Sequence, residues 1–335
     1  MPFVDDLIKH TSVSIIGTEK NTGKTECLKH ILRRLDGSGH RLAVTSIGLD
    51  GEGIDQVTLT PKPEIFLSEG TIFVTTEAHF RTKKLDAEIL DVSQQRTSLG
   101  RLITARVKGR GKVLLSGPSD TIWLKKLIDQ MQLYQIDTTL VDGALSRQSP
   151  GSPAITQAMV LTTGAALSVN INTLVSKTAF LYELIQLPLW DNPLSEKMLQ
   201  QTHGVWAVDE YGHMHELPFQ SAFTLDANKE ELFRHGHTIY VSGAITSRLL
   251  NTLRMQPNIG KTRLIARDFS KIFADHQSYQ AFTKNGGQIN VLLQTKLIAL
   301  CVNPVSPKGY ILDSVKLREQ MQATLQIPVY DLFNL

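Results

Sequence analysis

The stretch from residue 13 to residue 35 constrains the fold more than any other part of the chain. A short apolar, β-branched run at residues 13–16 leads into a polar loop that has a glycine at each end, Gly17 and Gly23. From residue 24 onward the apolar residues recur at helical spacing, which predicts an amphipathic helix over residues 24–35. A strand, a glycine-bounded loop and a helix in this order predict an α/β fold with the loop at the carboxyl end of the strand.

The residue types in this loop predict a phosphate-binding P-loop. Backbone N–H groups and the positive end of the helix macrodipole would face an anion, and Gly23 lets the backbone come close to it. Lys24 supplies a mobile ammonium group for the outer phosphates, and the hydroxyl of Thr25 can ligate Mg²⁺. The alternative is a chance Gly-Lys-Thr at a helix start, which the strand before it and the long amphipathic helix after it disfavour.

The spacing of the glycines departs from the common P-loop pattern. Gly-x-x-x-x-Gly-Lys-Thr would place a glycine at position 18, where this chain has Thr18; the glycine stands one position earlier. In this respect the loop resembles that of the dethiobiotin synthetase and cobyrinate amidotransferase branch of P-loop NTPases. The resemblance implies binding of a nucleotide, ATP rather than GTP, together with Mg²⁺. The residues that it implies at the nucleotide are Gly17, Thr18, Glu19, Lys20, Asn21, Thr22, Gly23, Lys24, Thr25 and Glu26.

Carboxylates are expected at the same edge of the sheet. A strand at residues 42–47 leads into a glycine-rich loop that contains Asp50. Ligands collect at the carboxyl ends of parallel strands, so this residue is interpreted as a Mg²⁺ ligand or a water-positioning carboxylate. The alternative is a solvated acidic turn, and the same two interpretations apply to Glu52 and Asp55.

Asp142 ends a second buried strand, residues 138–142, and is followed by Gly-Ala. A carboxylate in such a place is costly to bury unless a cation pairs with it. It matches an acidic residue that organises the metal in the resembled branch, although that branch usually has glutamate. The metal set is therefore Thr25, Asp50 and Asp142, and the catalytic set is Lys24, Asp50 and Asp142. Arg147, in the following loop, is a candidate for contact with phosphate or a carboxylate substrate, and the alternative is a surface arginine.

The rest of the first 200 residues predicts secondary structure and only a few further candidates for a functional site. Residues 82–100 lean towards helix, and residues 103–107 and 112–116 are expected to be strands joined by a hairpin turn at 109–111. The uncharged region after residue 147 is interpreted as a buried helix from 154 followed by a core strand ending near 177, because its polar residues disfavour a transmembrane span. Further candidates for contacts with a substrate or base are His79, Asn170, Asn172 and Lys177, with surface positions as the alternative.

From about residue 200 the residue pattern along the chain changes, and domains at 1–200 and 201–335 are expected. The fold class is α/β, a mostly parallel sheet flanked by helices, with a further α/β C-terminal region that either forms a second domain or extends the first sheet. A hairpin is predicted near Gly212. The histidine pairs at 213 and 215 and at 235 and 237 could bind a metal if they met in space, and surface histidines are the plainer interpretation.

Composition limits the classes of partner. A net charge of +3 without a dense basic run does not suggest nucleic acid. Cys27 and Cys301 lie far apart, which suits a reducing cytoplasm and gives neither a disulfide framework nor a metal site. The N-terminus shows no signal-peptide pattern. A cytoplasmic protein without a membrane partner is therefore expected.

Residues 141–147 and 303–309 also resemble a family of accessory proteins proposed to reactivate cobalamin-dependent lysine aminomutases. The resulting hypothesis is a P-loop ATPase that acts as a switch or reactivating factor, with a metabolic enzyme or a second copy of the chain as partner. Ordering of loops 48–55 and 143–153 by the γ-phosphate and Mg²⁺ would drive it. The alternative is a carboxylate-activating ligase of the dethiobiotin synthetase type, with Arg147 or Lys62 holding the substrate. A nucleotide-binding structural protein with degenerate catalysis is a third hypothesis.

Overall fold

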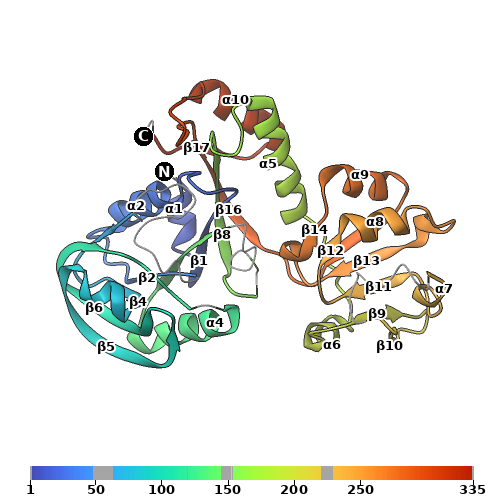
Figure 1. The fold of residues 1–335 in the computed structure, drawn as a ribbon, viewed down its shortest axis with the longest axis horizontal. Helices are drawn as coiled ribbons and strands as arrows, with labels where there is room; N and C mark the ends of the chain where they lie inside the picture. The colour runs from blue at the N-terminus through green and yellow to red at the C-terminus, as the bar shows by residue number, and fades with distance from the viewer. Residues whose placement is uncertain are drawn as a thin grey trace. The chain divides into compact units, whose positions relative to one another are not determined.

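The computed structural model describes residues 2–47, 63–118, 120–144, 152, 154–219 and 229–333. The chain divides into two compact units, Met1–Ala179 with Lys296–Leu335, and Phe180–Thr295 (Figure 1). These units differ from the consecutive domains expected from the sequence, because the second unit is inserted between two parts of the first. The chain leaves the first unit within helix α5 (Ile171–Ile185) and returns to it at the start of strand β16 (Lys296–Asn303).

The first unit is built on one large, mostly parallel sheet. Strand β1 (Ser12–Gly17) lies inside it, between β7 (Thr138–Ala144) and β8 (Ala158–Gly164), and both pairings are parallel. The full order is β17 (Val329–Asp331), β16, β8, β1, β7, β2 (Leu42–Ser46), β4 (Ile72–Thr76), β6 (Gly100–Val113) and β3 (Ile65–Leu67), with β5 (Lys84–Thr97) paired to β6. Only the pairings made by β6 are antiparallel among these strands. The expected α/β class with a mostly parallel sheet is confirmed.

Helices cover both faces of this sheet. Neighbouring strand residues point to opposite faces, and Val44 belongs to the core cluster that includes α2 (Lys24–Leu35), whereas Ala43 packs with α4 (Thr121–Gln130). Helix α2 has the predicted bounds, and its buried residues are Cys27, Leu28, Ile31 and Leu35. The other helical segments of this unit are α1 (Pro2–Leu7), α3 (Glu77–Arg81), a 3₁₀ turn (Met131–Tyr134) and α10 (Ser314–Leu325).

The expected helix at 82–100 is wrong, and so is the hairpin turn at 109–111. Residues 84–97 form strand β5, and β6 runs without a break from Gly100 to Val113. The glycines allow a close approach of β5, since a Cβ at position 111 would lie 2.0 Å from the backbone oxygen of Lys84. Most of β5 is exposed on both faces, and several register shifts interrupt its pairing, so the two-residue alternation that marks a strand is weak.

The expected order of a helix and then a strand between 154 and 177 is reversed. Residues 158–164 form β8, and residues 171–185 form helix α5, which Asn170 begins by accepting a hydrogen bond from the backbone N–H of Thr173 at 3.0 Å. Every residue of β8 is buried. A strand that is covered on both faces has a continuous apolar pattern, which periodicity cannot distinguish from a buried helix.

The second unit contains a smaller sheet, in the order β10 (Met214–Glu216), β9 (Val205–Val208), β11 (Thr238–Val241), β13 (Arg263–Ala266) and β15 (Gln288–Val291). The last three strands are parallel, and helices α8 (Ser247–Leu253) and α9 (His276–Lys284) lie in the connections between them. Strands β9 and β10 form the predicted antiparallel hairpin, with Gly212 at φ +80°. The shorter elements are α6 (Ser195–Gln200), α7 (Lys229–Leu232), β12 (Ile245–Thr246), β14 (Ile272–Phe273) and 3₁₀ turns at Ile259–Lys261 and Phe269–Lys271.

The C-terminal region therefore includes both alternatives, a separate sheet and an extension of the first sheet. Residues 205–291 contribute to a separate sheet, whereas β16 and β17 extend the sheet of the first unit. No helix within the described part of the chain combines the length and apolar character needed to cross a lipid bilayer.

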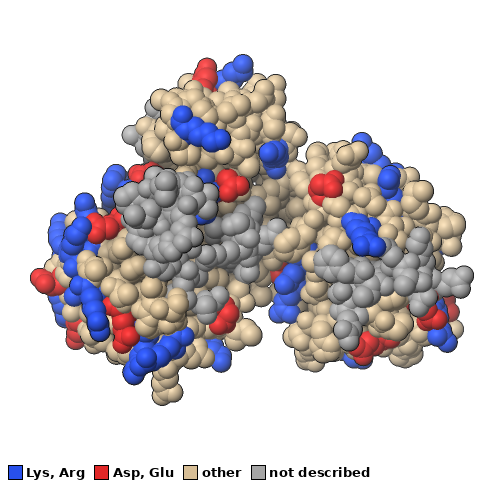
Figure 2. Space-filling view, viewed as in Figure 1, with Lys and Arg blue, Asp and Glu red and all other residues tan. Residues whose placement is uncertain are grey.

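Charge is distributed over the surface in both signs. Figure 2 shows basic and acidic side chains interspersed over the visible face. Exposed ion pairs in the first unit include Lys84 with Glu64 at 2.9 Å and Lys108 with Glu88 at 3.0 Å. Such pairs contribute little to stability, and a mixed surface of this kind mainly favours solubility.

Candidate functional site

The candidate site is the glycine loop, residues 17–23, which joins the carboxyl end of β1 to the start of α2. Gly23 stands at the N-cap of α2 with φ +99° and, having no side chain, supplies no capping hydrogen bond. The backbone oxygen of Gly23 accepts the first helical hydrogen bond, from the N–H of Cys27 at 2.9 Å. The twelve-residue helix therefore begins at Lys24 without the side-chain cap that an N-cap residue usually supplies to the first N–H groups, and an anion can bind to these groups instead.

Close contacts within the loop require the glycine at position 17. A Cβ at Gly17 would lie 2.6 Å from Oγ1 of Thr22, 2.9 Å from the backbone oxygen of Glu19 and 3.0 Å from Cδ of Lys24. The loop thus folds back tightly over its own first residue. This explains why a glycine is needed at position 17 rather than at position 18 of the common pattern.

Threonine hydroxyls fix the loop to the carboxyl end of β8. The buried Thr22 donates to the backbone oxygen of Glu19 at 2.9 Å, and its Oγ1 lies 3.2 Å from Oγ1 of Thr162. The backbone N–H of Thr18 donates to the oxygen of Thr162 at 2.9 Å, and its hydroxyl donates to that of Thr163 at 3.1 Å. No role at the loop was predicted from the sequence for Thr162 and Thr163, so their contacts with the loop were missed.

The returning C-terminal segment forms a second support. The side-chain amide of Asn303, at the end of β16, donates to the backbone oxygen of Asn21 at 3.1 Å. A Cβ at Gly23 would lie 3.1 Å from Cβ of Asn303 and 3.5 Å from Cδ1 of Leu332. The sequence singled out residues 303–309 only through a resemblance and gave them no role at the loop.

The two cysteines add a contact between the same elements. Cys27 on α2 and Cys301 on β16 are both free and fully buried. A hydrogen bond with the Cys27 thiol, together with burial, raises the pKa of Cys301 well above its usual value. Both therefore act as small apolar core residues that join α2 to β16, rather than as reactive thiols.

Asp142 lies at the same sheet edge as the glycine loop. It pairs in register with Ile15 of β1, two residues before Gly17, and with Ser46 at the end of β2. Its side chain is half-buried, and its backbone oxygen accepts a hydrogen bond from the N–H of Ile47 at 3.1 Å. Adjacent parallel strands thus bring Asp142 beside the loop, in the position that the sequence predicts.

The remaining residues of the predicted nucleotide site divide into two groups. Glu19, Lys20 and Asn21 are exposed, whereas Lys24 and Thr25 are half-buried at the start of α2. Glu26 is half-buried as well and forms an ion pair with Lys29 at 2.7 Å. Three other predicted positions, Asp50, Lys62 and Arg147, lie outside the described residues, as do Glu52 and Asp55.

The chemistry of the donors fits a magnesium ion only if other oxygens complete its shell. In the described ranges, no three His, Cys, Asp or Glu side chains are grouped so as to hold a metal ion. The Thr25 hydroxyl and the Asp142 carboxylate are hard oxygen donors, and Mg²⁺ usually keeps several waters and takes phosphate oxygens besides one or two carboxylates. The described residues are thus compatible with Mg²⁺ held jointly with a phosphate.

The other candidate side chains lie away from the loop's contacts. His79 is buried in α3, where Nδ1 hydrogen-bonds with the hydroxyl of Ser116, so its interpretation as a surface histidine is wrong. Asn172 and Lys177 are exposed on helix α5, not at a strand end.

The histidine pairs of the second unit do partly meet. The rings of His215 and His235 stack with centroids 4.1 Å apart, and Nε2 of His215 lies 2.7 Å from Oδ2 of Asp209. Nδ1 of His213 lies 3.4 Å from the same oxygen. The hydrogen bond from His215 holds the pKa of Asp209 well below its usual value. These contacts do not form a metal site among the described side chains.

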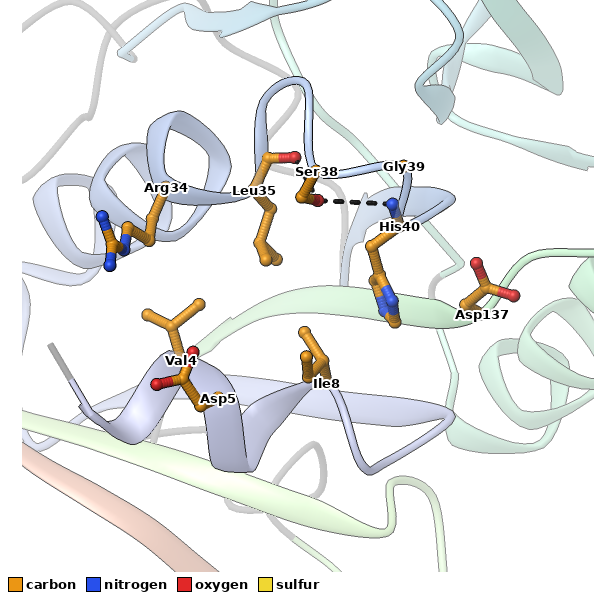
Figure 3. A pocket seen from close by; sticks show the side chains of 9 residues that line it. All are labelled: Val4, Asp5, Ile8, Arg34, Leu35, Ser38, Gly39, His40 and Asp137. Atoms are coloured by element: carbon orange, nitrogen blue, oxygen red, sulfur yellow. Dashed lines mark hydrogen bonds between the residues drawn. The ribbon is translucent and has the colours of Figure 1, made fainter.

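A surface cavity of about 440 Å³ lies at the opposite edge of the sheet. Figure 3 shows Val4 of α1 and Ile8, just after this helix, facing the end of α2, with His40 and Asp137 at the other side. Asp137 directly precedes β7, whose far end carries Asp142, so the cavity is at the amino ends of the strands. None of the residues predicted at the nucleotide lines it, and the candidate site remains the glycine loop.

Comparisons with protein-family models, with curated proteins and with solved structures find no match to this chain.

Proposed function

We propose that residues 13–35 form a P-loop and that the protein binds a nucleoside triphosphate, ATP in preference to GTP, together with Mg²⁺. The observation that carries this proposal is the left-handed Gly23 at the uncapped start of α2, followed by Lys24 and Thr25. Uncapped N–H groups at a helix start and a nearby ammonium group are the elements that stabilise bound phosphates.

Each residue has a role that follows from its place. The N–H groups of the loop and of the first turn of α2 would bind the inner phosphate oxygens, and Lys24 would neutralise the outer ones. Mg²⁺ would supply charge neutralisation at the transferring phosphoryl group, with the Thr25 hydroxyl and the Asp142 carboxylate as protein ligands. Catalysis of hydrolysis would then rest mainly on positioning and on stabilisation of charge.

We further propose that hydrolysis acts as a switch that changes the affinity of the protein for a partner enzyme. The support is the path of the chain. Thr18 is hydrogen-bonded to Thr163, whose hydroxyl lies 3.1 Å from that of Thr178 on α5, and α5 is the helix that leads into the second unit. The chain returns through β16, which ends at Asn303 beside the loop. One connection to the second unit thus leaves the first unit directly after Thr178, and the other leads into the strand that ends at Asn303, so a change in the loop has a physical route towards both.

Calorimetric titration with ATP and GTP, with and without Mg²⁺, tests the proposal, using Lys24→Ala and the control Lys29→Ala. Both variants remove one lysine from α2, but Lys29 pairs with Glu26 outside the loop. Lys24→Ala should weaken ATP binding about 10- to 100-fold, because hydrogen bonds to charged groups contribute about 1.5–3 kcal/mol. Lys29→Ala should bind as the wild type does. Tight ATP binding by Lys24→Ala would sink the P-loop assignment.

Phosphate release by the protein alone then separates the functional classes. Metal-dependent binding with slow turnover supports a partner-driven switch. Turnover that begins only when a small carboxylate is added would support the ligase of the dethiobiotin synthetase type instead.

A further inference from the structure

Asn303 is a buried side chain, 6% exposed, that touches the glycine loop from outside it. It is 282 residues away from Asn21 in the sequence, yet its amide nitrogen donates to the backbone oxygen of Asn21 at 3.1 Å. Its Cβ also limits the space around Gly23, at 3.1 Å from the position that a Cβ would take there. Asn303 therefore bonds to one of the two loop residues that have positive φ, Asn21 at +61°, and occupies the space beside the other, Gly23 at +99°.

Asn303 is itself held in a single arrangement. Its Oδ1 accepts a hydrogen bond from the N–H of Val305 at 2.9 Å, which ends β16 in a local turn. Its backbone oxygen accepts from the N–H of Ala165 at 2.8 Å, and this approach requires Gly164, since a Cβ there would lie 2.1 Å from that oxygen. The backbone of Asn303 is thus bonded to the residue that follows β8, and its side chain is bonded within the turn that follows β16.

The conformation that Asn303 supports is one that a chain rarely adopts unaided. An asparagine with positive φ is tolerated but disfavoured relative to the right-handed region. Left-handed residues within a loop turn successive N–H groups towards a common concavity, which is how backbone nests bind anions. Fixing the carbonyl of Asn21 fixes the peptide that continues into Thr22 and Gly23.

We propose that Asn303 is a positioning residue that holds the glycine loop in its anion-binding conformation through Asn21. This inference rests on the proposed function, since it concerns the same loop. Asn303 acts on the phosphate part of the site, because its bond goes to Asn21 and its Cβ lies beside the position of Gly23, both of which belong to the glycine loop. The C-terminal segment that follows the second unit is then part of the site.

Hydrogen exchange of the nucleotide-free protein tests the geometry without any ligand. Asn303→Asp keeps the shape and the acceptor for Val305 but cannot donate to Asn21, and Asn303→Ala removes both bonds. Each should raise exchange at residues 18–25 about tenfold while leaving β1 and β8 protected. The control Asn290→Ala removes a similar amide-to-backbone bond, to Pro188 at 3.3 Å in the second unit, and should leave residues 18–25 unchanged. Wild-type exchange at residues 18–25 in a folded Asn303→Asp protein would overturn the proposal.

Binding then tests which part of the ligand depends on Asn303. Asn303→Ala should weaken Mg²⁺–ATP and Mg²⁺–tripolyphosphate by the same factor, about five- to tenfold, since both are bound by the loop. A loss confined to ATP would overturn the positioning role, because Asn303 would then act on the nucleoside. If the wild type binds neither ligand, the proposed function fails, while the exchange experiment still decides whether Asn303 holds the loop.

Discussion

Gly23→Ala is expected to destabilise the protein in two ways, by backbone strain and by crowding, and a second glycine allows the two effects to be measured separately. An L-residue in the left-handed region costs about 1–2 kcal/mol. At position 23 the added methyl group would also meet Cβ of Asn303 at 3.1 Å and Cδ1 of Leu332 at 3.5 Å. Gly37 is the matched control, because it has φ +72° and nothing lies within 4 Å of its added Cβ. Crowding in a packed site typically adds about 1 kcal/mol or more.

We therefore expect Gly37→Ala to lower the free energy of unfolding by about 1–2 kcal/mol and Gly23→Ala to lower it by about 2–3 kcal/mol. Urea titration followed by circular dichroism measures both values for the nucleotide-free protein. Affinity for Mg²⁺–ATP should fall only in Gly23→Ala, since the loop must shift to accept the methyl group. Equal destabilisation of the two variants with unchanged affinity would refute the described loop geometry.

Two further predictions concern single carboxylates. Asp142→Asn should reduce the gain in ATP affinity that Mg²⁺ provides, while ATP binding without Mg²⁺ stays close to that of the wild type. Calorimetry with and without the ion measures this gain. An unchanged gain would show that Asp142 is not part of the site. Asp137, next to the cavity at the opposite edge, has its pKa lowered to about 2 by hydrogen bonds from Arg41. Because the folded-state pKa is the lower one, its contribution to stability is present above about pH 4 and is lost as the pH falls towards 2. Asp137→Asn should therefore flatten the stability profile in that window, measured by thermal unfolding between pH 2 and pH 5, and a profile as steep as that of the wild type would count against the pair.

The parts of the fold that the sequence predicted have strong local signals. Helix α2 combines a glycine at its start with a regular apolar stripe, and β7 contains a short buried run that is followed by Asp142, two residues before the end of the strand. Since parallel strands align their carboxyl ends, predicting these two elements was sufficient to place Asp142 beside the loop. The nearness of Lys24, Thr25 and Asp142 to one edge of the sheet follows from topology alone.

The parts that could not be predicted depend on partners that are distant in the sequence. Strand β8 was taken for a helix because its burial on both faces removes the alternation of a strand. The contact of Thr22 with Thr162 spans 140 residues, and that of Asn303 with Asn21 spans 282 residues. The residues next to Thr22, Thr162 and Asn303 in the sequence form no pattern that predicts these contacts. The second unit separates β16 from strands β1–β8 of the first sheet by more than 100 residues, so the sequence does not indicate that β16 belongs to this sheet.

The most direct test of the central claim is hydrogen exchange of the whole protein with and without saturating Mg²⁺–ATP. If the glycine loop binds the phosphates, the protection gained on binding is concentrated at residues 17–26, with a smaller gain around Asp142 near the end of β7. Protection centred on residues 34–40 beside the cavity, or no change anywhere at saturation, would contradict it.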